Sequence, residues 1–243
     1  MTQKPKAKKL LQVAREAWDP EKIVVQYDDV RLKMLSYAIL APNPFNKQPW
    51  HLLLKNKNEI NLYIDPDRLL PMTDPLHRLI YASQGTFLEL LSIAAKEFGY
   101  KPTIQLFPEG IDPVEKTGKS PMASIIIAKT KVEKDDLFSQ IPLRVTNHRP
   151  SKGPPITEEE LKILQKSYNN VKNYPMRFIT DAEKISKIAN LMSEAFKIEV
   201  YTERTYAETP KMFRFNANEV ATYRDGFNYE NMGVTGNVKF FAE

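Results

Sequence analysis

The chain has 243 residues, of which 42% are hydrophobic and 27% are charged, and this composition is typical of a folded globular protein. The net charge is +5, but the sequence contains no nucleic-acid-binding motif. The three histidines lack the spacing of metal ligands, and no segment reaches the roughly 18 apolar residues that a membrane span requires. Because cysteine is absent, disulfides, thiol catalysis and thiolate metal sites are excluded.

The N-terminal part, residues 1–27, reads as a basic tail followed by a short helix over residues 10–18 that ends at Asp19-Pro20. The tail lacks the apolar core of a secretory signal, so we expect a cytoplasmic protein with no metal, nucleic-acid or membrane partner. Helical spacing then predicts a helix over residues 28–40 with Asp28 as its N-cap. A proline-bounded loop, residues 41–50, leads from this helix into a strand.

The remaining elements follow from alternation, helical spacing and capping signals. Two strands at 50–54 and 59–65 form a hairpin, and a helix starts at Asp74-Pro75 and stops at Gly99. Further strands are expected at 101–107, 123–129 and 175–180, of which the isoleucine-rich 123–129 is central. Further helices are expected at 135–139, after the Thr157/Glu160 capping box, from the Asp181 cap to Tyr201, and over 203–224 with a break at Pro210.

The loop 41–50 reads Ala-Pro-Asn-Pro-Phe-Asn-Lys-Gln-Pro-Trp. Asn43, Asn46 and Gln48 carry side chains that both donate and accept hydrogen bonds, which suits them to reading the edge of a flat heterocycle. The same amides could instead cap a turn by satisfying local backbone groups. The residues alone leave both interpretations open.

A second polar stretch is Arg144-Val-Thr146-Asn147-His-Arg149. Two guanidinium groups flanking a hydroxyl and an amide suit a phosphate, although a solvated basic linker has the same composition. Acids and arginines also gather between Asp65 and Arg78, and their pattern favours ion pairs that join a turn to a helix start over a catalytic carboxylate site. His77, among them, is predicted to be a surface or pairing histidine. No glycine-rich phosphate loop or nucleophile elbow is present, so any redox or group-transfer chemistry would belong to a bound cofactor.

The loop 41–50 closely resembles the Ala-Pro-Ser-x-x-Asn-x-Gln-Pro-Trp signature of the nitroreductase family, which are FMN-binding flavoenzymes. Asp65-Pro-x-Arg68, Asp74-Pro75-x-x-Arg78, Gln84-Gly85 and Arg144-x-Thr146-Asn147-x-Arg149 resemble the Acg-type branch, in which one chain carries two nitroreductase-like lobes and imitates the usual homodimer. The resemblance spans roughly residues 28–226. It implies an α+β fold with a nitroreductase-like, antiparallel-rich sheet flanked by helices and a second, partial nitroreductase-like lobe.

By this resemblance residues 28–140 are the first lobe, and residues 141–243 are a second lobe that we expect to be C-terminally truncated. One FMN per chain is implied, with Pro42, Asn43, Asn46 and Gln48 along its ring and ribityl side and Arg144, Thr146, Asn147 and Arg149 around its phosphate. The family's serine is replaced by Asn43, and Pro44 lacks a backbone donor. The chain would be a monomeric pseudo-dimer or a homodimer.

The implied activity is NAD(P)H-dependent reduction of a small nitroaromatic or quinone-like acceptor through the flavin, with no catalytic side chain of the protein's own. Two alternatives stand beside it. The chain could bind or sequester FMN without turnover behind an occluding lid, or it could be a folded remnant that binds no flavin.

Overall fold

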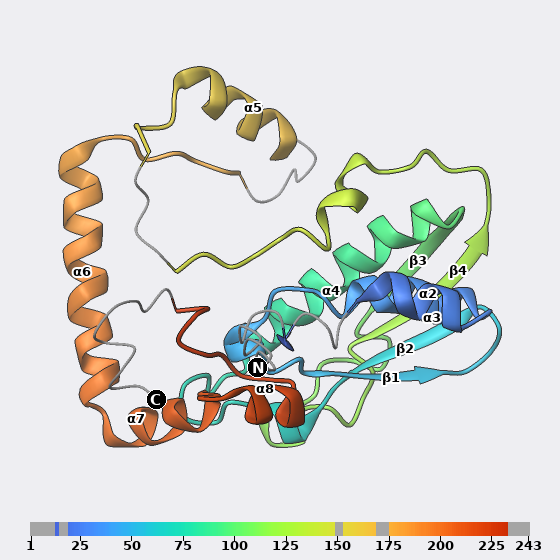
Figure 1. The fold of residues 1–243 in the computed structure, drawn as a ribbon, viewed down its shortest axis with the longest axis horizontal. Coiled ribbons are helices and arrows are strands. Elements are labelled where there is room, and N and C mark those ends of the chain that lie inside the picture. Colours follow the sequence, from blue (N-terminus) through green and yellow to red (C-terminus); the bar gives the residue numbers. More distant parts are fainter. Residues whose placement is uncertain (1–12, 15–18, 149–152, 169–174, 233–243) are drawn as a thin grey trace, which may run out of the picture. The chain divides into compact units, whose positions relative to one another are not determined.

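The computed structural model describes residues 13–14, 19–148, 153–168 and 175–232 (Figure 1). These residues fall into two compact units, one within Met1–His148 and Glu208–Glu243 and the other within Arg149–Ala207. The helices of the first unit are α2 (Pro20–Gln26), α3 (Val30–Ala38), α4 (Arg78–Glu97) and α8 (Ala217–Tyr223), and its strands are β1 (Trp50–Leu54), β2 (Glu59–Ile64), β3 (Tyr100–Leu106) and β4 (Ala123–Lys129). The second unit contains α5 (Glu158–Tyr168), α6 (Ala182–Tyr201) and most of α7 (Glu203–Glu208).

The four strands form one antiparallel sheet in the order β1-β2-β4-β3. The β1–β2 hairpin is closed by residues 55–58, where Lys55 N–H donates to the carbonyl of Glu59 over 3.1 Å. Strand β4 pairs on both sides, with Ile125 opposite Ile60 and Ile104, so the predicted central strand is confirmed. The mixed composition of helices and an antiparallel sheet agrees with the predicted α+β class.

One face of the sheet is apolar and packs against helices. Helix α4 packs on β2 and β3, and α3 packs on α4 (Figure 1). Phe87 and Leu91 of α4 and Ile60, Leu62 and Ile125 of the sheet are fully buried in this core. Each such side chain contributes roughly 1.5–3 kcal/mol by leaving water. Lys101, Thr103 and Gln105 of β3 are exposed, as expected for a sheet that faces solvent on its other side.

Aspartates start several of the helices, and one of the predicted caps is off by a residue. Asp29, not Asp28, caps α3, and its carboxylate accepts from Arg31 N–H at 2.9 Å. Asp19-Pro20 begins helix α2, because Asp19 accepts from Glu21 N–H and the proline occupies the first turn. The preceding helix predicted at 10–18 lies almost entirely outside the described residues.

The predicted start of α4 also needs correction, and His77 takes one of its two predicted roles. The helix begins at Arg78 and not at Pro75, while Asp74 reaches forward and its carboxylate accepts from Leu79 N–H and Ile80 N–H at 2.9 and 3.1 Å. His77 is buried, which excludes the surface alternative, and its Nδ1 lies 3.0 Å from the Thr117 hydroxyl, so the histidine has a protein partner as the pairing alternative predicted. A left-handed backbone at His77 turns the chain into the helix and the imidazole into the protein.

In the second unit the Thr157/Glu160 capping box and the Asp181 cap of α6 are confirmed. The strand predicted at 175–180 is wrong, since these residues form no regular secondary structure and pair with no strand in the described part of the chain. The domain limits predicted at residues 27 and 140, and the second nitroreductase-like lobe, stay predictions. By packing, residues 208–232 belong with the sheet-containing unit.

Candidate functional site

The loop between α3 and β1 has an unusual backbone for a segment without glycine. Phe45, Asn46 and Gln48 have φ values of 50°, 52° and 52°, in the left-handed region that residues other than glycine seldom adopt. Asn43 stabilises this shape, because its Oδ1 accepts from Gln48 N–H at 2.7 Å and its Nδ2 donates to the Ala41 carbonyl at 3.0 Å. The amide of Asn43 is therefore used by the turn itself.

Side chains from later elements bind the loop's carbonyl groups. Thr86 Oγ1 donates to Pro42 O at 2.9 Å, Arg68 Nη1 to Lys47 O at 2.9 Å, and Gln84 Nε2 to Pro49 O at 2.6 Å. These bonds explain the polar side of α4 and the arginine of the 65–68 turn. The Arg68 side chain also pairs with Asp65 at 3.3 Å, an ion pair within the turn, while Asp74 accepts from backbone N–H groups at the helix start.

Gln84 has one further property. It is fully buried, and its Oε1 has no hydrogen-bond partner among the described residues. A buried acceptor without a donor costs about 1–3 kcal/mol. Gln84 is not among the residues that line the cavity described below.

The C-terminal segment contacts the same loop from the other side. Gln48 Nε2 donates to the Arg224 carbonyl at 2.7 Å, across 176 residues of sequence. The Phe45 and Phe227 rings stack with centroids 5.6 Å apart. Gln48 is 8% exposed, so its side chain is committed to protein contacts. Of the loop's three amide side chains, Asn43, Asn46 and Gln48, Asn46 is the exposed one.

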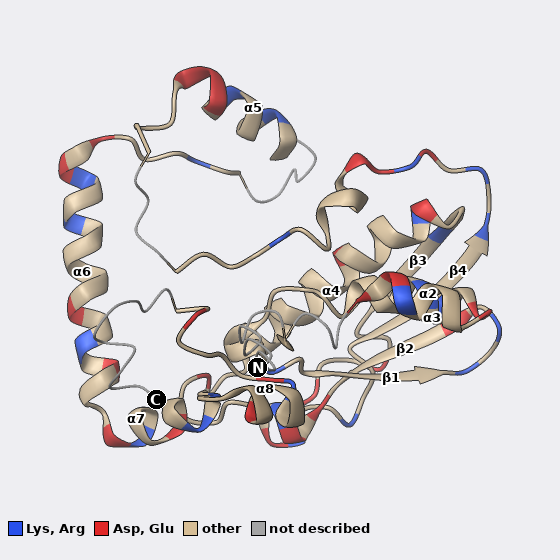
Figure 2. Ribbon diagram, viewed as in Figure 1, with Lys and Arg blue, Asp and Glu red and all other residues tan. Residues whose placement is uncertain are grey.

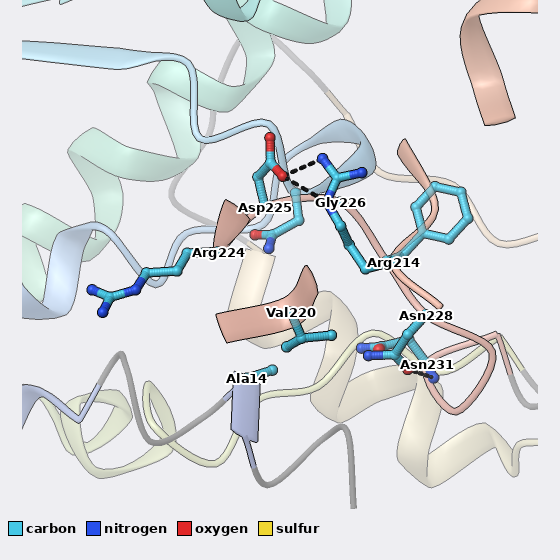
Figure 3. Close-up of a pocket in the computed structure, with 10 residues that line it drawn as sticks. Ala14, Arg214, Val220, Arg224, Asp225, Gly226, Asn228 and Asn231 are labelled. Carbon is cyan, nitrogen blue, oxygen red and sulfur yellow. Dashed lines mark hydrogen bonds and ion pairs between the residues drawn. The ribbon is translucent and has the colours of Figure 1, made fainter. Parts of the chain in front are cut away.

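A cavity of about 70 Å³ lies between Asn46 and this C-terminal segment (Figure 3). Figure 3 shows the Arg214 guanidinium facing the Asp225 carboxylate, to which its Nε donates at 3.1 Å. Arg214 also donates to two backbone carbonyls, and its guanidinium stacks on the Tyr223 ring. Every part of this guanidinium is therefore occupied, and it fixes the turn around Gly226 instead of presenting a free charge.

The arginine-rich stretch reaches the opposite end of the loop. Arg144 Nη2 donates to the carbonyl of Leu40 at 3.3 Å, and Nη1 donates to the Thr146 hydroxyl at 3.3 Å. Arg144 and Thr146 are exposed, and partial removal from water lowers the pKa of Arg144, which still carries its charge at neutral pH. Asn147 is exposed as well, while Arg149 lies outside the described residues.

The predicted site residues are thus distributed over the two ends of one loop. Arg144 and Thr146 lie beside Leu40, and Asn46 lines the cavity, which Arg144 does not. Asn43 bonds to local backbone groups, as the capped-turn interpretation predicted, whereas Gln48 donates both to the nearby Asn46 carbonyl and to the distant Arg224 carbonyl. Sequence reasoning missed Glu208, Arg214 and Phe227, whose roles depend on contacts with residues far away along the chain.

The described residues contain no group of three or more His, Cys, Asp or Glu side chains positioned to hold a metal ion. None of their helices combines the length and apolar character that crossing a membrane requires.

Comparison with known proteins gives a likeness among solved structures. No protein-family model matches the chain, and no curated protein matches it. Among solved structures, it is similar to the crystal structure of a nitroreductase family protein from Streptococcus pneumoniae TIGR4, with 15% sequence identity and a TM-score of 0.33. The likeness covers 45% of this chain and 83% of that chain. At this identity and overlap it does not assign the chain to a family.

Proposed function

We propose that this chain is an FMN-binding oxidoreductase of the nitroreductase type. The contact between Arg144 and Leu40 supports this proposal most directly. It brings a guanidinium and the neighbouring Thr146 hydroxyl beside the head of the amide-rich loop, in the same compact unit. A charged fork with an adjacent neutral donor is the arrangement that recognises a phosphate group.

The donor set fits FMN at the phosphate end. Arg144 and Thr146 are exposed and are bonded only to one carbonyl and to each other in the interactions described above. Asn46 is exposed and would read the edge of the ring, whereas Asn43 and Gln48 would act by holding the loop's shape. The 70 Å³ cavity is far smaller than the roughly 300–1,000 Å³ of a typical cofactor site, so the ring would need the C-terminal segment to move.

When bound, FMN would pass electrons from NAD(P)H to a nitroaromatic or quinone-like acceptor. The chain's own residues would supply binding and orientation and no reactive group. Arg144 and Thr146 would fix the phosphate, and the loop held by Asn43 would present Asn46 in one conformation.

A second candidate, a protein that binds FMN without turning it over, is favoured by a specific observation. The C-terminal segment contacts the loop through Gln48 and Phe45, and it covers the side on which Asn46 lies. A flavin held under this segment would be shielded from an acceptor.

The decisive experiment is a titration of the purified chain with FMN, followed by flavin fluorescence. Saturation at one FMN per chain is expected. Arg144→Ala should raise Kd by about 10- to 150-fold, equivalent to about 1.5–3 kcal/mol for a lost charged hydrogen bond. Arg78→Ala removes an exposed arginine of the same unit and should leave Kd unchanged. A chain that takes up no FMN would overturn both candidates.

Two further measurements separate enzyme from storage protein and test Asn46. Under anaerobic conditions NAD(P)H should bleach the visible absorbance of the bound flavin if the chain is an enzyme, and should leave it unchanged if the flavin is covered.

Asn46→Ala should shift the flavin spectrum or reduction potential more than it changes phosphate affinity. An unaltered spectrum and potential would remove Asn46 from the ring site.

A further inference from the structure

The unit within Arg149–Ala207 has amphipathic helices but almost no interior. Among its described residues only Thr205 is buried. Every residue of α6 is exposed, including Leu191 at 72%, Met192 at 66%, Phe196 at 64% and Ile198 at 70%. Large contiguous apolar surfaces of this kind mark interaction sites in soluble proteins.

The apolar side chains of α6 lie on one continuous face. At 100° per residue, one broad arc of the helix carries Ile185, Ile188, Leu191, Met192, Phe196, Ile198 and Val200. Their exposed fractions run from 39% at Val200 to 72% at Leu191, so the face is an uncovered apolar surface of the kind that a protein interface buries. Figure 2 shows the middle of α6 free of charged residues, with the charges toward its two ends.

The charges of α6 are arranged for pairing with an identical helix running in the opposite direction. Glu183–Lys187 and Lys197–Glu194 form ion pairs within the helix, each at 2.6 Å. Lys184 and Glu199 form none among the described residues. The centre of α6 falls between Leu191 and Met192, and Lys184 and Glu199 lie at equal distances on either side of it. Around the helix axis the two residues are about 60° apart, and both lie within the apolar arc.

We propose that α6 is a homodimer interface, in which two copies of the chain pack their α6 helices antiparallel about a two-fold axis beside Leu191 and Met192. A two-fold axis at this point brings Lys184 of each copy opposite Glu199 of the other, so both unpaired charges are matched. The antiparallel arrangement also places opposite ends of the helix dipoles together. The pairing needs neither FMN nor the loop 41–50.

The oligomeric state of the full chain tests the interface. Analytical ultracentrifugation over a range of concentrations should show a reversible dimer. Leu191→Glu, which puts a charge within the apolar arc at the midpoint of the helix axis, should give a monomer. Asn190→Glu makes the same change on the polar side of α6 and should leave the dimer intact. A chain that is monomeric at all concentrations, or equal behaviour of the two variants, would overturn the proposal.

Charge reversal tests the orientation of the helices. Lys184→Glu or Glu199→Lys alone places like charges opposite each other twice per dimer and should weaken association about tenfold. The double variant restores opposite charges and should recover most of the affinity. Single variants without effect, or a double variant weaker than both, would exclude the antiparallel register.

The absence of native cysteine allows a direct test of proximity. Leu191→Cys should form a covalent dimer on mild oxidation, because equivalent residues lie close together at a two-fold axis. Asn190→Cys should not. If Leu191→Cys were neither oxidised nor accessible to thiol reagents in a monomeric chain, α6 would be covered by its own chain and the dimer interface would be wrong.

Discussion

Gly118 and Gly110 have nearly the same backbone conformation and very different surroundings. Their φ values are +92° and +91°, in the region that favours glycine. A Cβ at Gly118 would overlap with the carbonyl oxygen of Ile64, whereas a Cβ at Gly110 would meet no atom within 4 Å. The pair therefore separates the cost of the backbone angle from the cost of close packing.

We expect Gly110→Ala to lower the free energy of unfolding by about 1 kcal/mol, the cost of a positive φ at alanine. Gly118→Ala should lower it by about 3 kcal/mol, because the strand-to-turn contact must also open. Urea denaturation of both variants measures the difference. Equal losses would mean that the contact with Ile64 adjusts without cost.

The site residues illustrate what the sequence holds at this scale. Asn43 is placed by two bonds within five residues, so its role as a turn amide follows from local chemistry. Gln48 also donates to Arg224, a partner that no local pattern reveals. The sequence identified both amides as important and left their partners undecided.

At the scale of elements, short-range capping bonds explain where most helices begin. Asp29 accepts from Arg31 both at the backbone and at the guanidinium, where the shortest side-chain distance is 2.6 Å. These bonds, chiefly the one from the guanidinium, lower the pKa of Asp29 below its ordinary value. The choice of Asp29 over its neighbour Asp28 depends on Arg31 and not on the cap residue alone.

This capping bond predicts a pH dependence of stability. A carboxyl whose pKa falls on folding stabilises the fold above its unfolded pKa of about 3.9, and this contribution is lost as pH falls through the lowered value. Asp29→Asn keeps a capping side chain and removes the charge. It should cost about 0.5–1 kcal/mol at neutral pH and almost nothing near the acid limit.

Urea unfolding at neutral pH and at progressively lower pH checks this expectation. Asp28→Asn is the matched control, because Asp28 is exposed and caps no helix. Its effect should be small and independent of pH. A cost of Asp29→Asn that persists in acid would assign the effect to shape and not to charge.

For the whole molecule, Glu208 joins the C-terminal segment to the sheet-containing unit. Its carboxylate accepts from Met72 N–H at 3.3 Å, Thr73 N–H at 2.9 Å and the Thr73 hydroxyl at 2.7 Å. Glu208 is 8% exposed, so these bonds form away from bulk water. They fix the start of the segment that continues to Phe227 and the loop 41–50.

Glu208→Ala should lower the free energy of unfolding by about 2–4 kcal/mol, because three donors lose a charged acceptor. It should also speed amide hydrogen exchange in residues 213–228 more than in β4, since the segment opens before the sheet does. Glu203→Ala removes an exposed glutamate of the same helix and should change neither quantity. Unchanged exchange in residues 213–228 would show that the aromatic contacts hold the segment without Glu208.

The sequence by itself determined the elements whose signals are local: the β1–β2 hairpin, the central position of β4, the stop at Gly99, the capping box at Thr157 and the length of α6. Tertiary structure decided the burial of His77, the lack of a strand at 175–180, and the packing of residues 208–232 on the loop 41–50. Caps and turns depend on groups a few residues apart. Burial and strand pairing depend on partners that only the folded chain brings within reach.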